Sequence, residues 1–225
     1  MFKKVLVSLS LLGVLFGVSA CGKTISSYVL ENMAEITEEY YFGENEDMVA
    51  TISKGQRESV YRVNGEATDL VDCALLTIRF KEENIRDAMA LDITSQGTTV
   101  QVEAEYNSFN NTYMKDIVDD IALGDEVSVV YEGQTLALTK QNFNIGYQRA
   151  IEIASETLSE ELDALKSYNN FNGECYLRII NMKDNDFSDL YWCFTCVDRE
   201  GNNITIILST ETGDVLASSL DENDE

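Results

Sequence analysis

The cysteines in the last third of the chain come closest to a chemical motif. Cys193 and Cys196 stand three residues apart in Trp192-Cys-Phe-Thr-Cys196. Such a pair performs dithiol redox chemistry when its first thiolate is stabilised at the N-terminus of a helix. Here the flanking residues predict a strand, in which residues three apart point to opposite faces. We therefore expect no dithiol catalysis from this pair.

A disulfide bond is the other chemistry that these cysteines can perform. Cys175 lies in the neighbouring predicted strand, where it can stand across from Cys193 or from Cys196. A disulfide among Cys175, Cys193 and Cys196 is therefore a candidate. With Cys73 there are four cysteines outside the N-terminal segment, and four allow three complete pairings among which a sequence cannot choose.

The chain lacks the residues that other catalytic sites and metal sites require. The chain has no histidine, which excludes a histidine base, a Ser-His or Cys-His pair and a histidine metal ligand. The single Cys-x-x-Cys is too little for a zinc site. Asp184-Asn-Asp186-Phe-Ser-Asp189 resembles the start of a calcium loop but lacks its glycine and its final glutamate, so we expect a solvated turn. We predict no catalytic residue, no metal site, no cofactor and no enzymatic activity.

The charge of the chain excludes one class of partner. It carries 16 basic and 40 acidic residues, for a formal net charge of −24. Phosphate recognition needs the opposite sign, so we expect no nucleic-acid partner. An anionic membrane surface would also repel this chain, so any membrane attachment must come from another feature.

The N-terminus supplies that feature. Lys3 and Lys4 precede an apolar run that ends in Val18-Ser-Ala-Cys21, the layout of a secretory signal. The last four residues resemble the lipobox of bacterial lipoproteins. The resemblance implies that residues 1–20 are removed and that Cys21 becomes a lipidated N-terminus on the extracytoplasmic face of the bacterial cell membrane. Two acyl chains suffice for stable anchoring. An ordinary cleaved signal that happens to end before a cysteine is the alternative.

The body of the chain predicts a helix followed by strands. Apolar residues at steps of three and four predict a helix that begins near Ile25 and ends before Gly43. From about Asp47 to Thr139 the period changes to two, as in Met89, Leu91 and Ile93. Roughly seven short strands are typical of an antiparallel sandwich or barrel. We predict a β-sandwich.

The last third returns to a helical period and ends in strands. A helix is predicted from Gly146 to Lys166, then strands at 174–182, 190–198 and 203–209. This order, with Trp192 and Phe194 in the middle strand and the closing Thr212-Gly-Asp-Val-Leu216, resembles the PepSY domain. The resemblance implies a small α+β (α-β-β-β) fold, and that family is thought to restrain peptidases.

Together these features predict a mostly β protein with helices. We assign residues 1–20 to a signal peptide, 21–27 to a lipidated tether, 28–140 to a helix plus β-sandwich, 145–220 to a PepSY-like α+β domain and 221–225 to an acidic tail. We expect a monomeric lipoprotein that binds a surface peptidase or a peptide. A structural or adhesive surface protein that works through its sandwich is the alternative, and a thiol-redox lipoprotein is a third hypothesis.

Overall fold

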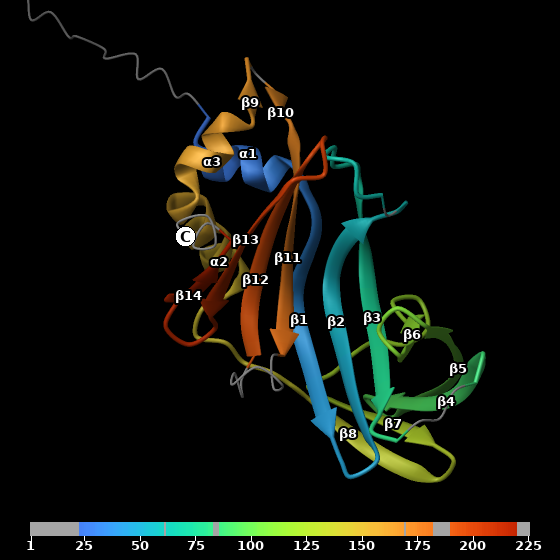
Figure 1. Ribbon diagram of the computed structural model, residues 1–225. Helices are drawn as coiled ribbons and strands as arrows, with labels where there is room; N and C mark the ends of the chain where they lie inside the picture. The colour runs from blue at the N-terminus through green and yellow to red at the C-terminus, as the bar shows by residue number, and fades with distance from the viewer. Residues whose placement is uncertain (1–22, 61, 83–85, 169, 182–189, 220–225) are drawn as a thin grey trace, which may run out of the picture.

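The computed structural model describes residues 23–60, 62–82, 86–168, 170–181 and 190–219, and Figure 1 shows its elements. Its helices are α1 (Ile25–Glu31), α2 (Tyr147–Thr157) and α3 (Ser159–Ala164). Its strands are β1 (Met33–Glu44), β2 (Met48–Glu58), β3 (Leu70–Phe80), β4 (Ala88–Ser95), β5 (Thr98–Asn107), β6 (Thr112–Asp116), β7 (Glu126–Tyr131), β8 (Gln134–Lys140), β9 (Lys166–Ser167), β10 (Asn170–Phe171), β11 (Gly173–Asn181), β12 (Leu190–Asp198), β13 (Asn203–Ser209) and β14 (Val215–Ser218). None of the helices in these ranges has the length and apolarity needed to cross a bilayer.

Eight strands form a closed barrel. They are hydrogen-bonded in the order β1-β2-β3-β6-β5-β4-β7-β8, and β8 pairs again with β1 through Tyr41↔Lys140 and Phe42↔Thr139. Alternate residues of these strands point inward, so the barrel interior is an apolar core. Ile52, Leu76 and Leu91 are among its fully buried members.

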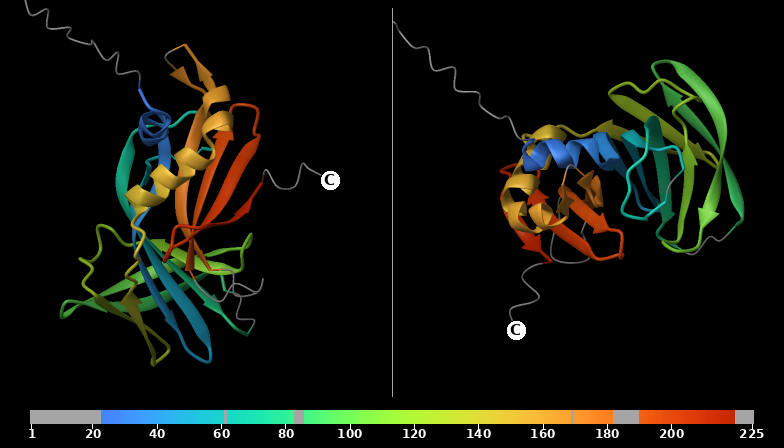
Figure 2. Two further views of the ribbon diagram at one scale, coloured as in Figure 1. Left: turned by 90° about the vertical axis from the view of Figure 1, so that its left-hand side faces the viewer. Right: turned by 90° about the horizontal axis from the view of Figure 1, so that it is seen from above.

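A second group of strands extends from the same sheet. Beyond β1 the sheet continues through β11, β12 and β13 to β14. The helices cover one face of this extension, as the view from above shows (Figure 2). Ile151 and Leu158 of that helical layer pack with Trp192 and Phe194 in a second apolar core, which is separate from the barrel interior.

Strand β1 belongs to both parts. Its first half pairs in parallel with β11, with Met33 opposite Cys175 and Ile36 opposite Leu177. Its second half pairs antiparallel with β8 and thereby closes the barrel. β2 runs beside β1 along almost its whole length, and their register shifts between Thr37 and Glu39. β11 and β8 therefore diverge from the same side of one strand.

The loop between β2 and β3 also ties the two parts together. The Oε1 atom of Glu174 accepts hydrogen bonds from the Asn64 backbone N–H and the Tyr176 hydroxyl, at 3.0 and 2.6 Å. Arg199 forms an ion pair with Glu66 of the loop at 2.5 Å. Glu174 is fully buried, so this contact lies inside the junction rather than on its rim.

The predicted fold class is wrong. The strands of residues 33–140 close into a barrel rather than stacking as two sheets of a sandwich, because β1 pairs with β8. Nor do residues 145–220 form an independent α+β PepSY-like fold, since β11 continues the sheet of β1 and α1 packs against α2. Whether 28–140 and 145–220 behave as separate domains stays a prediction.

The long N-terminal helix is also wrong. Helix α1 ends at Glu31, and residues 33–44 form β1. Met33 and Ile36 still share the helix-covered core, because a register shift between Met33 and Glu35 places residues three apart on one side. Tyr40, four positions after Ile36 and beyond a second register shift, belongs to the same core. An irregular strand has therefore reproduced the three-and-four spacing of a helix.

The close approach of β1 and β2 predicts the effect of a glycine substitution. A Cβ atom at Gly55 would lie 1.9 Å from the backbone oxygen of Ile36. We expect Gly55→Ala to lower the free energy of unfolding by about 1–3 kcal/mol, because the two strands must move apart.

Gly146→Ala is the matched control. No heavy atom lies within 4 Å of a Cβ atom there, and φ is −73°. Urea denaturation of both variants tests the expectation. Gly146 is the N-cap of α2, where alanine is a poorer cap than glycine, so a small loss is expected there too. A Gly55→Ala variant as stable as the wild type would contradict the description of the β1–β2 contact.

Candidate functional site

A cleft opens where β11 diverges from the barrel. Inward-facing residues of β2 and β3, such as Ile52 and Leu76, fill the barrel core. The residues between them, Ser53 and Leu75 among others, therefore point out of the barrel and line the cleft. On β11, Arg178 likewise lies between residues of the helix-covered core. The cleft thus occupies the sheet face that neither apolar core covers.

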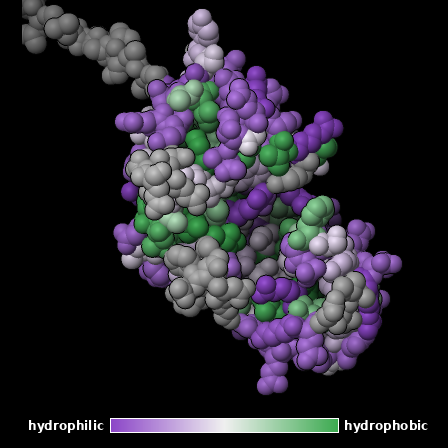
Figure 3. Space-filling view, in the orientation of Figure 1, coloured by the Kyte–Doolittle hydropathy of each residue, from purple (hydrophilic) through white to green (hydrophobic). Residues whose placement is uncertain are grey.

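The cleft has the size of a ligand site. Its volume is about 700 Å³, and ligand sites usually span about 300–1,000 Å³. The space-filling view shows a hollow between the two halves of the molecule (Figure 3). Most of its lining side chains are polar: Glu35, Thr37, Ser53, Lys54, Arg57, Thr77, Asn107, Asn110 and Arg178.

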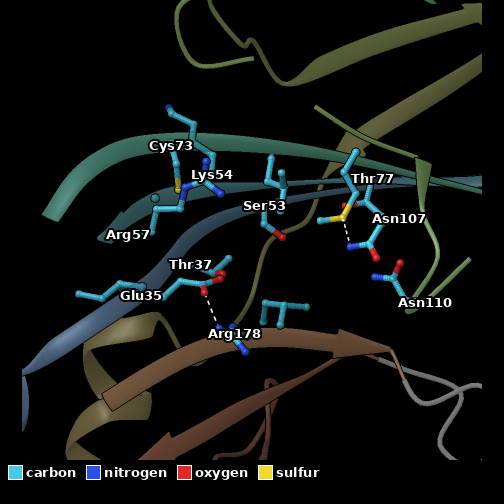
Figure 4. A pocket seen from close by; sticks show the side chains of 15 residues that line it. Glu35, Thr37, Ser53, Lys54, Arg57, Cys73, Thr77, Asn107, Asn110 and Arg178 are labelled. Atoms are coloured by element: carbon cyan, nitrogen blue, oxygen red, sulfur yellow. Dashed lines mark hydrogen bonds and ion pairs between the residues drawn. The ribbon is translucent and has the colours of Figure 1, made fainter. Parts of the chain in front are cut away.

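Two ion pairs hold arginines on its walls. Arg178 Nη2 lies 2.5 Å from Glu35 Oε2, and Arg57 Nη2 lies 2.6 Å from Asp116 Oδ2. Half-exposed pairs of this kind stabilise a fold by about 1 kcal/mol or less. Their main effect here is on position, because each carboxylate fixes a guanidinium group that presents a fork of N–H donors. Figure 4 shows Arg57 and Arg178 on opposite walls.

Glu35 stands between the two arginines. It is the register partner of Arg57 on β2, while its carboxylate binds Arg178 of β11. Asp116 is held in turn, because its Oδ1 atom accepts the backbone N–H groups of Ala74 and Val118 at 3.1 and 3.2 Å. The positions of both arginines are thus set by the sheet itself.

Neutral amides line one end of the cleft. Asn107 and Asn110 lie beside Thr77, at the turn between β5 and β6 (Figure 4). Asn107 Nδ2 donates to the sulfur of Met114 at 3.3 Å. An amide group offers both a donor and an acceptor. This end can therefore bind a neutral polar group, whereas the arginines suit an anionic one.

Cys73 is the cysteine of the cleft, and its thiol is not activated. Burial raises its pKa to about 11, with Asp116 and Glu35 adding to the rise and Arg57 opposing it. The thiolate is the nucleophilic form of cysteine. At neutral pH this thiol is protonated, so the cleft does not contain a cysteine nucleophile.

The cysteines of the predicted disulfide are free thiols and lie on two faces of the second sheet. Cys175 and Cys196 are register partners, and both belong to the helix-covered core. Cys193 is opposite Arg178 on the other face, where its sulfur lies 3.9 Å from the Thr195 hydroxyl. The structure therefore brings Cys175 and Cys196 together and keeps Cys193 apart from both.

Two sequence predictions fall outside the described residues. The lipidation site Cys21, with residues 1–20, precedes the described part of the chain. The turn from Asp184 to Asp189 lies in the undescribed range 182–189. Both stay predictions.

A second hollow, on the outer side of the barrel, is lined by acidic residues. Asp72, Asp116, Asp119 and Asp120 surround it together with Lys115. Within the described ranges no three Cys, Asp or Glu side chains converge as a metal site would require. We therefore treat the cleft at β1 as the candidate site.

Sequence reasoning did not predict this cleft, and it counted Cys73 only among the cysteines that could form disulfides. Arg57, Glu35 and Arg178 are separated by up to 143 positions and meet only because β1 pairs with both β2 and β11. One weak signal was present: charged residues inside strand patterns, each on the face opposite the apolar residues.

Comparisons with known proteins give no relative. No protein-family model matches the chain, and no curated protein or solved structure matches it. The cleft geometry therefore carries the functional argument.

The raised pKa of Cys73 predicts its chemical behaviour. A rise to about 11 leaves roughly one hundredth of the thiolate that an ordinary cysteine has at pH 8. We expect alkylation of Cys73 by iodoacetamide at pH 8 to be at least tenfold slower in the folded chain than in urea, with the folded rate rising as the pH approaches 11.

Peptide mass mapping of Cys73 measures both rates. The Glu35→Gln variant is informative, because loss of a carboxylate that raises the pKa should speed the reaction. Folded Cys73 that reacts as fast as unfolded Cys73 would contradict the environment described.

Proposed function

We propose that this chain is a lipid-anchored extracytoplasmic binding protein, and that the cleft beside β1 binds a short polar ligand carrying a carboxylate. The observation that supports the proposal most strongly is the placement of Arg57 and Arg178 on facing walls of one cleft. Guanidinium groups bind carboxylates through paired charge-assisted hydrogen bonds. A peptide with a free C-terminus has this chemistry.

The strongly negative charge of the whole chain makes the basic residues of the cleft more significant for ligand binding. With a formal net charge of −24, most of the surface repels an anion. Arg57, Arg178 and Lys54 all line the cleft, although the chain has only 16 basic residues. The cleft is therefore the proposed point of attachment for an anionic group, which must compete there with Asp116, Glu35 and Glu39, the present partners of these three side chains.

The rest of the cleft suits a peptide-like ligand. Asn107 and Asn110 can pair with amide groups, and Leu75 and Met114 add apolar contacts on the walls of β3 and β6. No aromatic ring is among the residues that line the cleft in the described structure, so it lacks a flat stacking surface. Hydrogen bonds and charge must then supply the specificity.

The anchoring part of the proposal rests on the N-terminal sequence. The positive residues, the apolar run and Val18-Ser-Ala-Cys21 support export followed by lipidation. Cys21 precedes the start of α1 at Ile25 by only four positions. A short tether of this kind would keep the folded part near the membrane surface.

The other hypotheses have less support. The partnership with a surface peptidase followed from the PepSY resemblance, which the fold contradicts, and adhesion followed from a sandwich that is not formed. A dithiol redox role would need Cys193 and Cys196 to meet, and they lie on opposite faces of β12.

Lipidation predicts the behaviour of a Cys21→Ser variant. We expect the wild-type chain, expressed with its leader, to partition into the detergent phase of a Triton X-114 extract of cells. Cys21→Ser should move to the aqueous phase, because serine lacks the thiol that receives the lipid. Wild-type protein in the aqueous phase would contradict the anchoring proposal.

The carboxylate site predicts a specific loss of affinity. A degenerate pool of pentapeptides with free C-termini is the probe, titrated calorimetrically into residues 22–225. We expect Arg57→Gln to weaken binding by about tenfold or more, because a hydrogen bond to a charged group contributes about 1.5–3 kcal/mol. C-terminal amidation of the pool should have a similar effect.

Arg149→Gln is the matched control. It removes the same charge from α2, where Arg149 pairs with the exposed Glu152 at 2.9 Å. It should leave the affinity unchanged. Equal losses in both variants, equal affinity of free and amidated pools, or no binding of the pool would contradict the proposed site.

A further inference from the structure

We propose that Cys175 and Cys196 form a disulfide bond in the exported protein, whereas Cys73 and Cys193 remain thiols. The bond would join the beginning of β11 to the end of β12, on the face of the sheet that the helices cover. Its formation in cells rests on the proposed export, because disulfides persist outside the cytosol. Its geometry does not depend on that proposal.

The register of β11 and β12 places these two cysteines side by side. They are direct partners in an antiparallel pair, between Glu174↔Val197 and Tyr176↔Thr195. Directly opposed residues have Cα atoms about 4.5–5.5 Å apart, which lies within the range that a disulfide spans. Both side chains point into the same core, where the Cys196 thiol helps to raise the pKa of the Cys175 thiol.

The positions of Cys73 and Cys193 prevent either of them from forming a disulfide bond in the folded chain. Cys193 points to the opposite face of β12, beside Arg178, and cannot reach Cys175 without turning the strand over. Cys73 lies on β3, with β2, β1 and β11 between it and β12. Of the three complete pairings, none forms without displacing a strand, so a single bond is the arrangement that fits.

Burial determines when the bond can form. Cys175 and Cys196 are 0% and 1% exposed, and a Cβ atom at Gly173 would already lie 2.9 Å from the Cys196 sulfur. An oxidant molecule therefore cannot reach these sulfurs in the folded chain. Burial also raises the pKa of the Cys175 thiol, with Cys196 adding to the rise. Oxidation must then accompany folding, before the helices cover the β11–β12 hairpin.

The chemistry is thiol–disulfide exchange with a small or protein-borne disulfide as oxidant. One cysteine thiolate attacks a sulfur of the oxidant and releases one thiol, which leaves a mixed disulfide. The second cysteine thiolate attacks that mixed disulfide, forms the Cys175–Cys196 bond and releases the second thiol. The protein loses two electrons and two protons, and the oxidant gains them.

Refolding with a defined oxidant tests the geometry. Residues 22–225 are unfolded in urea with reductant, refolded with oxidised and reduced glutathione, alkylated and digested with trypsin without reduction. Cleavage after Lys166, Arg178, Lys183 and Arg199 separates Cys175 from Cys196 but leaves Cys193 and Cys196 in one peptide. The Cys193→Ser variant removes that ambiguity.

We expect the cross-linked peptide from both the wild type and Cys193→Ser, and its loss in Cys196→Ser, with Cys73 alkylated in every case. Reductant should lower the melting temperature of Cys193→Ser by about 5–10 °C, since a link across such a loop constrains the unfolded chain. Full alkylation of Cys175 and Cys196, or a cross-linked peptide that persists in Cys196→Ser, would overturn the proposal.

Trapping the redox state of the cysteines in cells tests the disulfide proposal independently of the proposed binding site. Cells are quenched with acid and alkylated before lysis, and the same peptides are mapped. A linked Cys175–Cys196 peptide supports the proposal. Free thiols in cells, after efficient oxidation during refolding, would overturn it for the exported protein and leave the peptide titration of the cleft unaffected.

Discussion

The structure depends on the double pairing of β1. One side of this strand pairs with β11 near Met33 and with β8 near Tyr41, and no strand can remain hydrogen-bonded to both partners along its whole length. The two partners must therefore separate. One continues a sheet that the helices cover, and the other closes the barrel. Gly55 permits the close contact between β2 and β1 at the register shift.

The candidate site follows from this divergence. Where β11 separates from the barrel, the sheet face between them is covered neither by the barrel core nor by the helix-covered core. Here that face carries charged and amide side chains in the cleft, next to a small apolar cluster of Ala34, Tyr176 and Val197. Glu35 lies on the shared strand, and it organises both walls through its register with Arg57 and its ion pair with Arg178. Fold and site therefore have one origin.

Local patterns predicted the parts of the fold that local physics determines. Met89, Leu91 and Ile93 alternate because one face of β4 is buried in the barrel, and the sequence shows that period. The strands of the last third were also placed within a few residues. Leu158 was expected inside one helix, but it separates α2 from α3 and still packs in the core.

Long-range pairing was not predictable in the same way. An alternating strand fits a sandwich or a barrel equally well, and only the β1–β8 contact decides between them. The parallel pairing of β1 with β11 joins segments about 140 positions apart, and no local signal encodes it. Because Glu35, Arg57 and Arg178 meet through these pairings, the candidate site was hidden as well. The sequence did predict that Cys175 lies in the strand next to that of Cys196, but it did not distinguish Cys196 from Cys193 as its partner.

Mapping the bound peptide on the protein tests the central claim most directly. Amide ¹H–¹⁵N spectra of residues 22–225 would be recorded with and without the free-acid pentapeptide pool. We expect the largest shifts at Glu35–Thr37 of β1, at Ser53–Arg57 of β2 and around Asn107, with little change in α2. Shifts confined to the barrel ends or to the helices, with the β1 cleft unperturbed, would contradict the assignment of the binding site.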